Sequence, residues 1–392
     1  MIVLPPIPTD PNPAAGPTVA QQGNSPVFLQ EQESHRRAMP LQRLLGGGMR
    51  YADAVALHEM ASLGVTWDTG AEWLGERNVR LAAAASTKVT ARECFRFASA
   101  CYRFGHSAIA RDTDRKRHMY RRMVDAYAKA AKLDHPETEK HEIPWRNGSL
   151  CGWLMRPSHA DFPPVVMVIG GFDGWREEYA LGAAALVERG LAVFLLDGPG
   201  QGETRLIHLV YLDTDFHEAF AAAAEYLRDR LGSRLRVGIW GNSLGGFLAA
   251  KTAAMHSSFA ALCVNGGTMR PMELPERHPR FMGKVEALVG SAEPERVLAI
   301  MQPLDLSADV SEIRCPLLQL HSPIDSVFTL DNARPIHDRA SSTDKTLLIW
   351  QDGDHCIYNH WEEKNMAVAD WFSARLGQSH ASGDIITMAN GE

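Results

Sequence analysis

The chain has 392 residues, more than one typical domain holds, so we expect a large domain and an accessory one. Hydrophobic residues make up 45% and charged residues 22%, as in folded soluble proteins with a full core. The net charge of −7 gives no reason to expect a nucleic-acid partner. No run of about 18 apolar residues predicts a membrane span, and the N-terminus lacks the pattern of a signal peptide.

The cysteines give no sign of a disulfide framework or a metal cluster. They are scattered and none forms a Cys-x-x-Cys pair; they are Cys94, Cys101, Cys151, Cys263, Cys315 and Cys356. This usage predicts reduced thiols in a cytoplasmic protein. We expect neither a metal nor another cofactor.

The first third of the chain divides into an arm and a helical domain. Residues 1–26 are rich in Pro, Gly, Asn and Gln, which predicts a flexible arm. Residues 27–138 have helical periodicity, and Thr90-Ala-Arg-Glu93 predicts a capping box at a helix start. A tetratricopeptide array is disfavoured because no second copy of Trp73-Leu-Gly75 follows at a fixed period. Further helices are expected at 51–63, 70–85 and 112–132.

The periodicity changes after His135-Pro136. Residues 139–378 begin with two strand-like segments around Asn147-Gly148, a hairpin turn signal. Short apolar runs then alternate with helical stretches, which predicts a doubly wound, mostly parallel α/β sheet. The expected strands are 165–169, 192–196, 237–240, 261–264, 317–320 and 346–350, and the expected helices are 179–189, 215–231, 244–256, 331–340 and 361–376.

One connection in this domain is longer than the sheet requires. Residues 268–303 carry prolines at positions 271, 275, 279 and 294, among others, and we expect this segment to contribute a lid-like insertion. Residues 379–392 are expected to form a C-terminal tail.

Ser243 lies in Gly241-Asn-Ser-Leu-Gly245, between an apolar strand and an alanine-rich helix. A Gly-x-Ser-x-Gly match alone is weak evidence, because a small residue in a tight turn gives the same pattern. The strand–turn–helix setting is the one that a nucleophile elbow requires. We therefore predict that Ser243 is a catalytic nucleophile.

A serine nucleophile needs a base and an acid, which in this kind of sheet follow it in the order acid, then histidine. The strand at 317–320 leads to Asp325, and the strand at 346–350 leads to His355. Both side chains follow carboxyl ends of strands, where open α/β sheets build their sites. We predict that Ser243, Asp325 and His355 form a catalytic triad.

Other polar residues near these strand ends have different expected roles. His321 ends a strand and is expected to pack or to support the site, whereas His360 lies near the start of the last helix. Asp331 is expected to cap a helix. Asp352 and Asp354 are expected to shape a loop.

A tetrahedral intermediate needs N–H donors aimed at its oxyanion. We predict the backbone N–H of Leu244 as one donor and that of Phe172, in the glycine-rich loop after the first parallel strand, as the other. Residues 197–203 resemble a phosphate-binding loop but lack its Gly-Lys pattern, so we interpret them as structural. His355 and His360 are five residues apart, which suits a metal site on one helical face poorly.

Four motifs together resemble the α/β-hydrolases related to 2,6-dihydroxypseudooxynicotine hydrolase, a group that includes fungal hydrolases that shorten polyketide pigment precursors. They are Gly-Gly-Phe-Asp-Gly-Trp-Arg-Glu-Glu-Tyr at 170–179, Asp-Gly-Pro-Gly-Gln-Gly-Glu at 197–203, Gly-Asn-Ser-Leu-Gly-Gly at 241–246 and Gly-Asp-His at 353–355. The resemblance covers roughly residues 140–376. The helical N-terminal region also fits, because these proteins carry such a cap domain and form dimers.

The resemblance implies hydrolysis of a carbon–carbon bond next to a carbonyl, on a small ketone or acyl substrate such as a β-diketone, an acyl phenol or a polyketide-like molecule. It matches Ser243, Asp325 and His355 to the group's triad, and it implies a substrate pocket between the two domains and a homodimer. Members also place an acidic residue in the lid-side segment, where Glu273 is the nearest match. A solvated lid glutamate would give the same sequence.

Three other functions remain open from the sequence. The same triad could hydrolyse an ester, thioester or amide, or it could catalyse acyl transfer or cyclisation in a biosynthetic pathway. A non-catalytic relative that binds a ligand or a protein is a third alternative.

Overall fold

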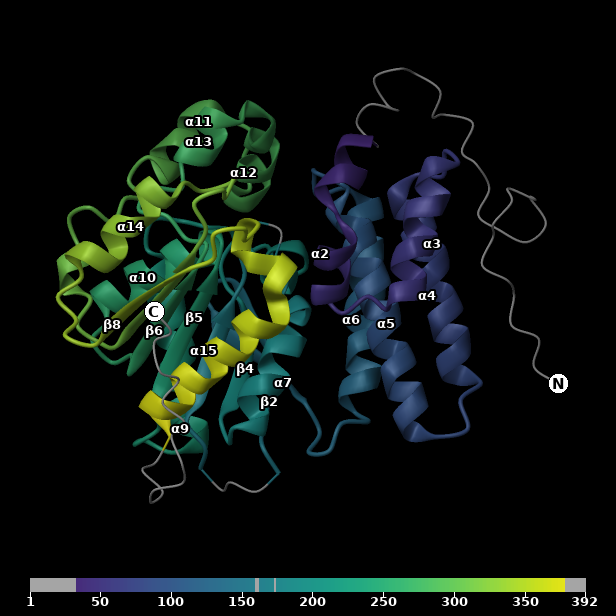
Figure 1. Cartoon of the computed structure of the whole chain (residues 1–392), viewed down its shortest axis with the longest axis horizontal. Coiled ribbons are helices and arrows are strands. Elements are labelled where there is room, and N and C mark those ends of the chain that lie inside the picture. Colours follow the sequence, from purple (N-terminus) through teal and green to yellow (C-terminus); the bar gives the residue numbers. More distant parts are fainter. Residues whose placement is uncertain (1–32, 159–161, 173, 378–392) are drawn as a thin grey trace.

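The computed structural model describes residues 33–158, 162–172 and 174–377. The predicted arm at 1–26 and the tail at 379–392 lie outside these residues. Figure 1 shows a bundle of helices beside an α/β body, and a group of short helices above one end of the body's sheet.

The helical region contains long antiparallel helices that pack against one another. Its core includes Leu57, Trp67, Leu74 and Phe104, which are all at most 2% exposed. The helices are α2 (Leu41–Gly46), α3 (Tyr51–Ser62), α4 (Trp67–Ala83), α5 (Lys88–Ser107) and α6 (Asp114–Ala131).

The start of α5 corrects one sequence prediction. The cap is Thr87, whose side chain accepts a hydrogen bond from the N–H of Thr90 at 3.2 Å, so Thr90 lies inside the helix. Glu93, the expected partner in a capping box, instead accepts hydrogen bonds from Arg92 and Arg96. The threonine three residues earlier satisfies the same kind of exposed N–H group, which is why the helix begins sooner.

The body is built on an eight-stranded sheet in the order β1-β2-β4-β3-β5-β6-β7-β8. The strands from β4 to β8 in this order run parallel, whereas β1 and β2 are antiparallel to their neighbours. This confirms the predicted mostly parallel α/β sheet that follows a helical N-terminal region. The strands are β1 (Glu139–Trp145), β2 (Gly148–Met155), β3 (Val165–Ile169), β4 (Ala192–Asp197), β5 (Val237–Asn242), β6 (Ala261–Asn265), β7 (Leu317–His321) and β8 (Lys345–Ile349).

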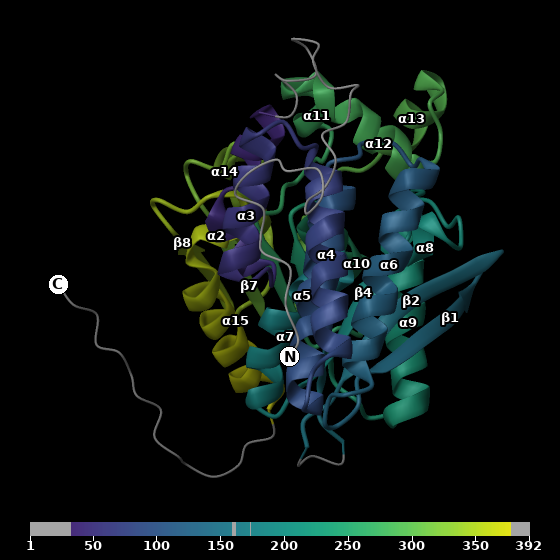
Figure 2. The same ribbon diagram turned by 90° about the vertical axis from the view of Figure 1, so that its right-hand side faces the viewer.

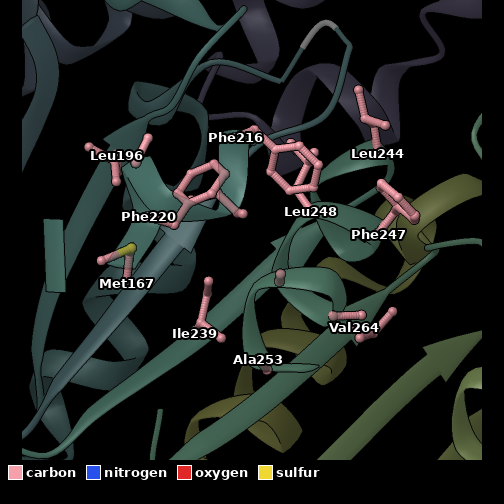
Figure 3. Packing of buried hydrophobic residues seen from close by; sticks show 14 of the residues in the cluster. Met167, Leu196, Phe216, Phe220, Ile239, Leu244, Phe247, Leu248, Ala253 and Val264 are labelled. Carbon is pink, nitrogen blue, oxygen red and sulfur yellow. The ribbon is translucent and has the colours of Figure 1, made fainter. Parts of the chain in front are cut away.

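Alternate residues of the central strands enter two separate cores, one on each face of the sheet. Met167 of β3 packs with residues of α9 (Phe216–Leu231) and α10 (Leu244–Met255), as Figure 3 shows. Val168 packs on the other face with residues of α7 (Ala180–Glu188) and α15 (Trp361–Leu376). That second core continues into α6 of the helical region, so the two parts share apolar packing.

The hairpin of β1 and β2 is tighter than its sequence signal suggested. Trp145 pairs with Gly148, so Arg146 and Asn147 form the turn and Gly148 already belongs to β2. Arg146 has a φ of +51°, a positive value at the first turn position. The Asn-Gly signal therefore predicted the hairpin but placed its turn one residue too late.

The long connection after β6 contains α11 (Glu273–Arg277), α12 (Met282–Val289) and α13 (Pro294–Met301). Figures 1 and 2 show these helices together at one end of the sheet. We call residues 268–303 the lid. The remaining larger helix, α14 (Leu330–Arg339), follows β7. Its cap is Thr329, whose side chain accepts from the N–H of Asn332, so the prediction that Asp331 caps this helix is wrong.

Within the described residues, no helix combines the length and the apolar character that a membrane crossing requires. All six cysteines lie in the described residues and all are free thiols.

Candidate active site

Ser243 occupies a strained turn between β5 and α10. Its φ of +59° and ψ of −127° are unusual for a residue with a side chain. A Cβ on Gly241 would lie 1.9 Å from the carbonyl oxygen of Gly245, and one on Gly245 would lie 2.3 Å from that of Gly170. The two glycines of the motif are therefore required for the turn to close around the serine.

The side chains of Ser243, His355 and Asp325 form one chain of hydrogen bonds. Nε2 of His355 lies 2.8 Å from Oγ of Ser243, and Nδ1 lies 2.8 Å from Oδ2 of Asp325. Asp325 follows β7 and is 1% exposed at its side chain, whereas the ring of His355, after β8, is 15% exposed. The structure thus brings together the three residues that the sequence singled out, in the arrangement of a nucleophile, a base and an orienting acid.

Each side chain of the His355–Asp325 pair stabilises the charged form of the other, which shifts both pKa values. Burial raises the pKa of the Asp325 carboxyl, but the charge of His355 and its hydrogen bond outweigh burial and bring that pKa below its usual value. Burial lowers the pKa of His355, but the Asp325 carboxylate outweighs it and raises that pKa above its usual value. The N–H groups of Val327 and Phe328 also donate to Oδ1 of Asp325, at 2.8 and 3.2 Å.

The two predicted oxyanion donors flank the serine. Leu244 is the first residue of α10, and the first N–H groups of a helix have no partner within it. Phe172 belongs to the loop after β3, which passes close to the serine: a Cβ on Gly171 would lie 2.7 Å from Cβ of Ser243. Both backbone positions are compatible with a donor role.

Residues 197–203 support this loop. The side-chain oxygen of Gln201 accepts from the N–H of Gly198 at 2.9 Å, and its amide nitrogen donates to the carbonyl of Gly170. The carboxylates of Asp197 and Glu203 are both ion-paired with the buried Arg176. This segment presents buried carboxylates rather than free N–H groups, so a phosphate group does not suit it.

A cavity of about 380 Å³ opens above the triad. Met39 and Arg43 line it from the helical region, Phe172 from the loop after β3, and Leu274 and Phe281 from the lid. Ser243 and His355 belong to the same lining. A wider groove of about 720 Å³ beside residues 208–213 includes none of the predicted site residues.

Residues 163–288, which include Ser243, match the family described as alpha/beta hydrolase fold. The chain has the α/β-hydrolase fold. It is 26% identical over 342 residues to a 2,6-dihydropseudooxynicotine hydrolase of Paenarthrobacter nicotinovorans, across 84% of this chain and 89% of that protein. A crystal structure of 2,6-dihydroxy-pseudo-oxynicotine hydrolase is similar with a TM-score of 0.77 at 25% identity, over 86% of this chain and 96% of that one.

A fungal relative is similar over a shorter part. The chain is 30% identical over 278 residues to a 20-hydroxy-prefusarin hydrolase of Gibberella moniliformis, across 58% of this chain and 65% of that protein. These similarities confirm the resemblance found in the sequence. The α/β-hydrolase described here is accordingly an enzyme of the hydrolase class.

Glu273 of the hydrolase lies in the lid but does not line the cavity. It is 2% exposed, and its Oε2 accepts hydrogen bonds from Asn332 and, at 3.3 Å, from Thr329. Its neighbour Leu274 lines the cavity instead. Glu273 thus connects the lid to the start of α14, and the alternative of a solvated lid glutamate is wrong because the side chain is buried.

The rival residues have partners of their own. His321 is 1% exposed, with its Nδ1 close to the backbone of Ser322. His360 precedes α15, and its Nε2 lies 3.1 Å from Oδ1 of Asp352. The carboxylate of Asp354 accepts from the N–H groups at 358 and 359, which shapes the loop as predicted.

Two side chains that were not predicted as site residues, Asn265 and Lys364, hold the backbone of the segment that carries His355, and we call this pair the clamp. Cys356 and Ile357 both have positive φ, +60° and +56°, which is costly for residues with side chains. The carbonyl of Cys356 accepts hydrogen bonds from Nδ2 of Asn265 and Nζ of Lys364, both at 3.1 Å. The carbonyl of Asn265 also accepts from the N–H of Ser243 at 2.8 Å.

One part of this clamp left a signal in the sequence. Asn265 is a polar residue at the end of an apolar strand, which marks the functional edge of the sheet. Lys364 lies inside the last helix and is 5% exposed, and no local pattern distinguishes it from a surface lysine. Burial lowers its pKa.

Proposed function

We propose that the hydrolase cleaves a carbon–carbon bond next to a carbonyl, with Ser243 as nucleophile, His355 as base and then acid, and Asp325 as the orienting carboxylate. The observation that carries this proposal is the continuous hydrogen-bonded chain from Ser243 to Asp325 at a cavity lined by both the helical region and the lid. The resemblance to ketone-cleaving relatives supports the choice of bond.

The first half of the reaction forms an acyl-enzyme. His355 takes the proton of Ser243 as Oγ attacks the substrate carbonyl, and the N–H groups of Leu244 and Phe172 bind the oxyanion. When the carbonyl re-forms, the neighbouring carbon–carbon bond breaks and its electron pair moves to the leaving carbon. Protonated His355 donates its proton to that carbon, which regenerates the neutral imidazole.

The second half uses water. His355 removes a proton from a water molecule that attacks the ester of Ser243, and it then returns the proton to Oγ as the acid product leaves. The carbon leaving group is acceptable only if its charge is delocalised, as in a β-diketone or a hydroxylated aromatic ring. An enclosed cavity would assist by limiting water before the acyl-enzyme forms.

The experiment compares two substrate classes with the wild-type chain and a Ser243→Ala variant. We expect slow or no turnover of simple activated esters and measurable cleavage of 1,3-diketones or acyl phenols, lost in the variant. Rapid ester hydrolysis without any ketone cleavage would support the esterase or thioesterase alternative. Absence of labelling at Ser243 by a fluorophosphonate in folded protein would instead favour a binding role.

A cytoplasmic homodimer remains part of the proposal. The similarity of the whole chain, helical region included, to the hydrolase of Paenarthrobacter nicotinovorans supports a comparable architecture. Sedimentation of the purified chain would test the dimer directly.

A further inference from the structure

Two histidines and a glutamate meet where the start of α9 lies against the end of α10. His217 is the second residue of α9, Glu218 follows it, and His256 is the residue at which α10 ends. The histidines are 39 residues apart in the sequence, so their contact depends on how the two helices pack. We call these three residues the His217 cluster. Its members are not among the described residues that line the cavity above Ser243.

The ligand atoms of the His217 cluster have nearly the spacing of a zinc site. Nδ1 of His217 lies 3.1 Å from Nε2 of His256. The carboxylate of Glu218 reaches both rings, with Oε1 3.6 Å from Nδ1 of His217 and Oε2 3.8 Å from Nε2 of His256. Atoms that each lie about 2.0–2.1 Å from a tetrahedral zinc ion are about 3.3 Å from one another. Glu218 is 54% exposed at its side chain, so a small rotation can close the remaining difference.

The protonation state of the rings also suits a metal ion. Burial lowers the pKa of His217, so its ring is neutral near neutral pH, and neutral imidazole is the form that binds metals. Without a metal, one of the two facing nitrogens must carry a hydrogen and the other must accept it. A metal ion would replace this shared hydrogen and bind a lone pair of each ring.

The charged groups around His217 have partners outside the His217 cluster. Lys251 and Asp215 both act on the charge of His217. The ammonium of Lys251 is ion-paired with Asp309, and the carboxylate of Asp215 is ion-paired with Arg146. With both rings neutral, the His217 cluster carries the single negative charge of its glutamate, which favours a divalent cation.

A second group of possible ligands suits a metal less well. It consists of Cys151, Glu203 and His208. The carboxylate of Glu203 is ion-paired with the buried Arg176 and, at 2.7 Å, with Lys140. Burial raises the pKa of the Cys151 thiol to about 12, whereas a cysteine must be a thiolate to bind a metal. The described residues therefore favour the His217 cluster.

We propose that His217, Glu218 and His256 bind a zinc ion that joins the start of α9 to the end of α10. Imidazole ligands favour zinc and similar transition metals over Mg²⁺ and Ca²⁺, which prefer oxygen. Three protein ligands leave the fourth position to water. Because α10 begins directly after Ser243, the ion braces the far end of the helix that follows the nucleophile.

This inference does not rest on the proposed reaction. It differs from the expectation of no metal, which considered only the spacing of ligands along the chain.

The test titrates the full chain, without a histidine tag and stripped of metal, with zinc chloride against a fluorescent zinc chelator. We expect one zinc ion per chain. His217→Gln and His256→Gln should each weaken binding about 100-fold, and Glu218→Gln about tenfold. His337→Gln is the matched control, because Nδ1 of His337 also lies close to the carboxylate of the next residue, at 3.0 Å. It should bind zinc as the wild type does.

Two further measurements distinguish this site from loose binding at the surface. Co²⁺ in a four-coordinate site absorbs visible light far more strongly than hydrated Co²⁺, so the wild type should show these bands and both histidine variants should lack them. Zinc should raise the unfolding midpoint in urea of the wild type but not of these variants, because it binds only the folded state. Equal midpoints without metal show that the variants are folded.

Zinc binding of wild-type strength in both histidine variants would overturn the proposal, and so would a lack of detectable zinc binding by the wild type. Magnesium that competes equally with zinc would contradict ligation by imidazole. Zinc that slows fluorophosphonate labelling of Ser243 equally in the wild type and both histidine variants would place the ion at His355, which also contradicts the proposal.

Discussion

At the scale of single residues, the distances around His355 determine how the site responds to pH. Its ring lies between Oγ of Ser243 and the carboxylate of Asp325, each 2.8 Å away. Only the neutral ring can accept the proton of the serine, and the carboxylate raises the pKa at which the ring becomes neutral. The carboxylate of Asp325 therefore orients the imidazole of His355 and also raises the pH at which this ring loses its proton.

We expect kcat/KM to rise with pH through a pKa above the usual histidine value of about 6.5. Asp325→Asn should lower that pKa and reduce kcat by about 10³–10⁴-fold, because the base then loses its correct tautomer. A pH–rate profile of each protein gives both quantities. A bell-shaped pH profile of kcat/KM with its maximum below neutral pH in the wild type would contradict this assignment.

The same pair predicts a pH dependence of stability. The folded pKa of His355 is raised, so its contribution is complete below about pH 6.5 and is lost as pH rises through the folded pKa. The folded pKa of Asp325 is lowered, so its contribution is present above about pH 4 and is lost as pH falls through the folded pKa. The free energy of unfolding, measured in urea against pH, should be less pH-dependent in Asp325→Asn.

The clamp on Cys356 gives a second prediction at this scale. Lys364→Met removes one of the two donors that hold a backbone with two positive φ values, so His355 should lose its fixed position. We expect kcat to fall about tenfold with little change in KM, since a small misplacement of a catalytic group is costly. An unchanged unfolding midpoint combined with an altered pH profile would separate positioning from a loss of stability.

At the scale of elements, the turn before α10 depends on close backbone contacts. Gly245→Ala would place a Cβ 2.3 Å from a backbone oxygen, and backbone cannot move aside cheaply. We expect it to destabilise the protein by about 3 kcal/mol and to abolish labelling of Ser243.

Gly283→Ala in α12 is the matched control. A Cβ there meets no atom within 4 Å, and alanine favours a helix over glycine by about 1 kcal/mol. It should therefore be neutral or slightly stabilising. Equal unfolding midpoints for the two variants in urea would contradict the account of the turn.

The same elements show what local sequence can and cannot predict. The strand at 165–169 was predicted with its observed bounds, because a buried parallel strand is an uninterrupted apolar run. Asp325 and His355 were found because they follow such strands. The cap at Thr87 and the turn at Arg146 were misplaced because several neighbouring residues could satisfy the same backbone groups.

The rest of the site depends on contacts between distant segments. Lys364 contacts a carbonyl that a strained loop presents, and the arginine and lysine residues that line the cavity come from the helical region and from the lid. Neither the contact of Lys364 nor the position of these cations can be predicted from local sequence, because each depends on how the sheet and the helices pack together. The nucleophile, acid and base were predictable, whereas their supports were not.

At the scale of the whole molecule, buried ion pairs join the helical region to the body. Arg103 of α5 lies 3.2 Å from Glu178, and Arg205 lies 3.2 Å from Asp112, which precedes α6. The hydroxyl of Tyr120 also donates to Asp197 at 3.2 Å. Because the cavity is lined from both parts, these contacts help to fix the shape of the site.

We expect Arg103→Met to cost about 3–5 kcal/mol, because it leaves the carboxylate of Glu178 buried without its charged partner. The double variant Arg103→Met, Glu178→Gln should recover part of that loss. A double-mutant cycle compares the free energies of unfolding in denaturant of the wild type, the two single variants Arg103→Met and Glu178→Gln, and the double variant. Additive effects would show that the pair does not couple the two parts.

The central claim is that Ser243 carries the acyl group of a cleaved ketone. The most direct measurement is mass spectrometry of products formed from a 1,3-diketone or acyl phenol in water enriched in oxygen-18, with wild-type and Ser243→Ala protein. We predict one heavy oxygen in the acid product of the wild type, an acylated Ser243 peptide on rapid quenching, and no product from the variant. Cleavage that persists in Ser243→Ala, or an acid product without the heavy oxygen, would contradict the account.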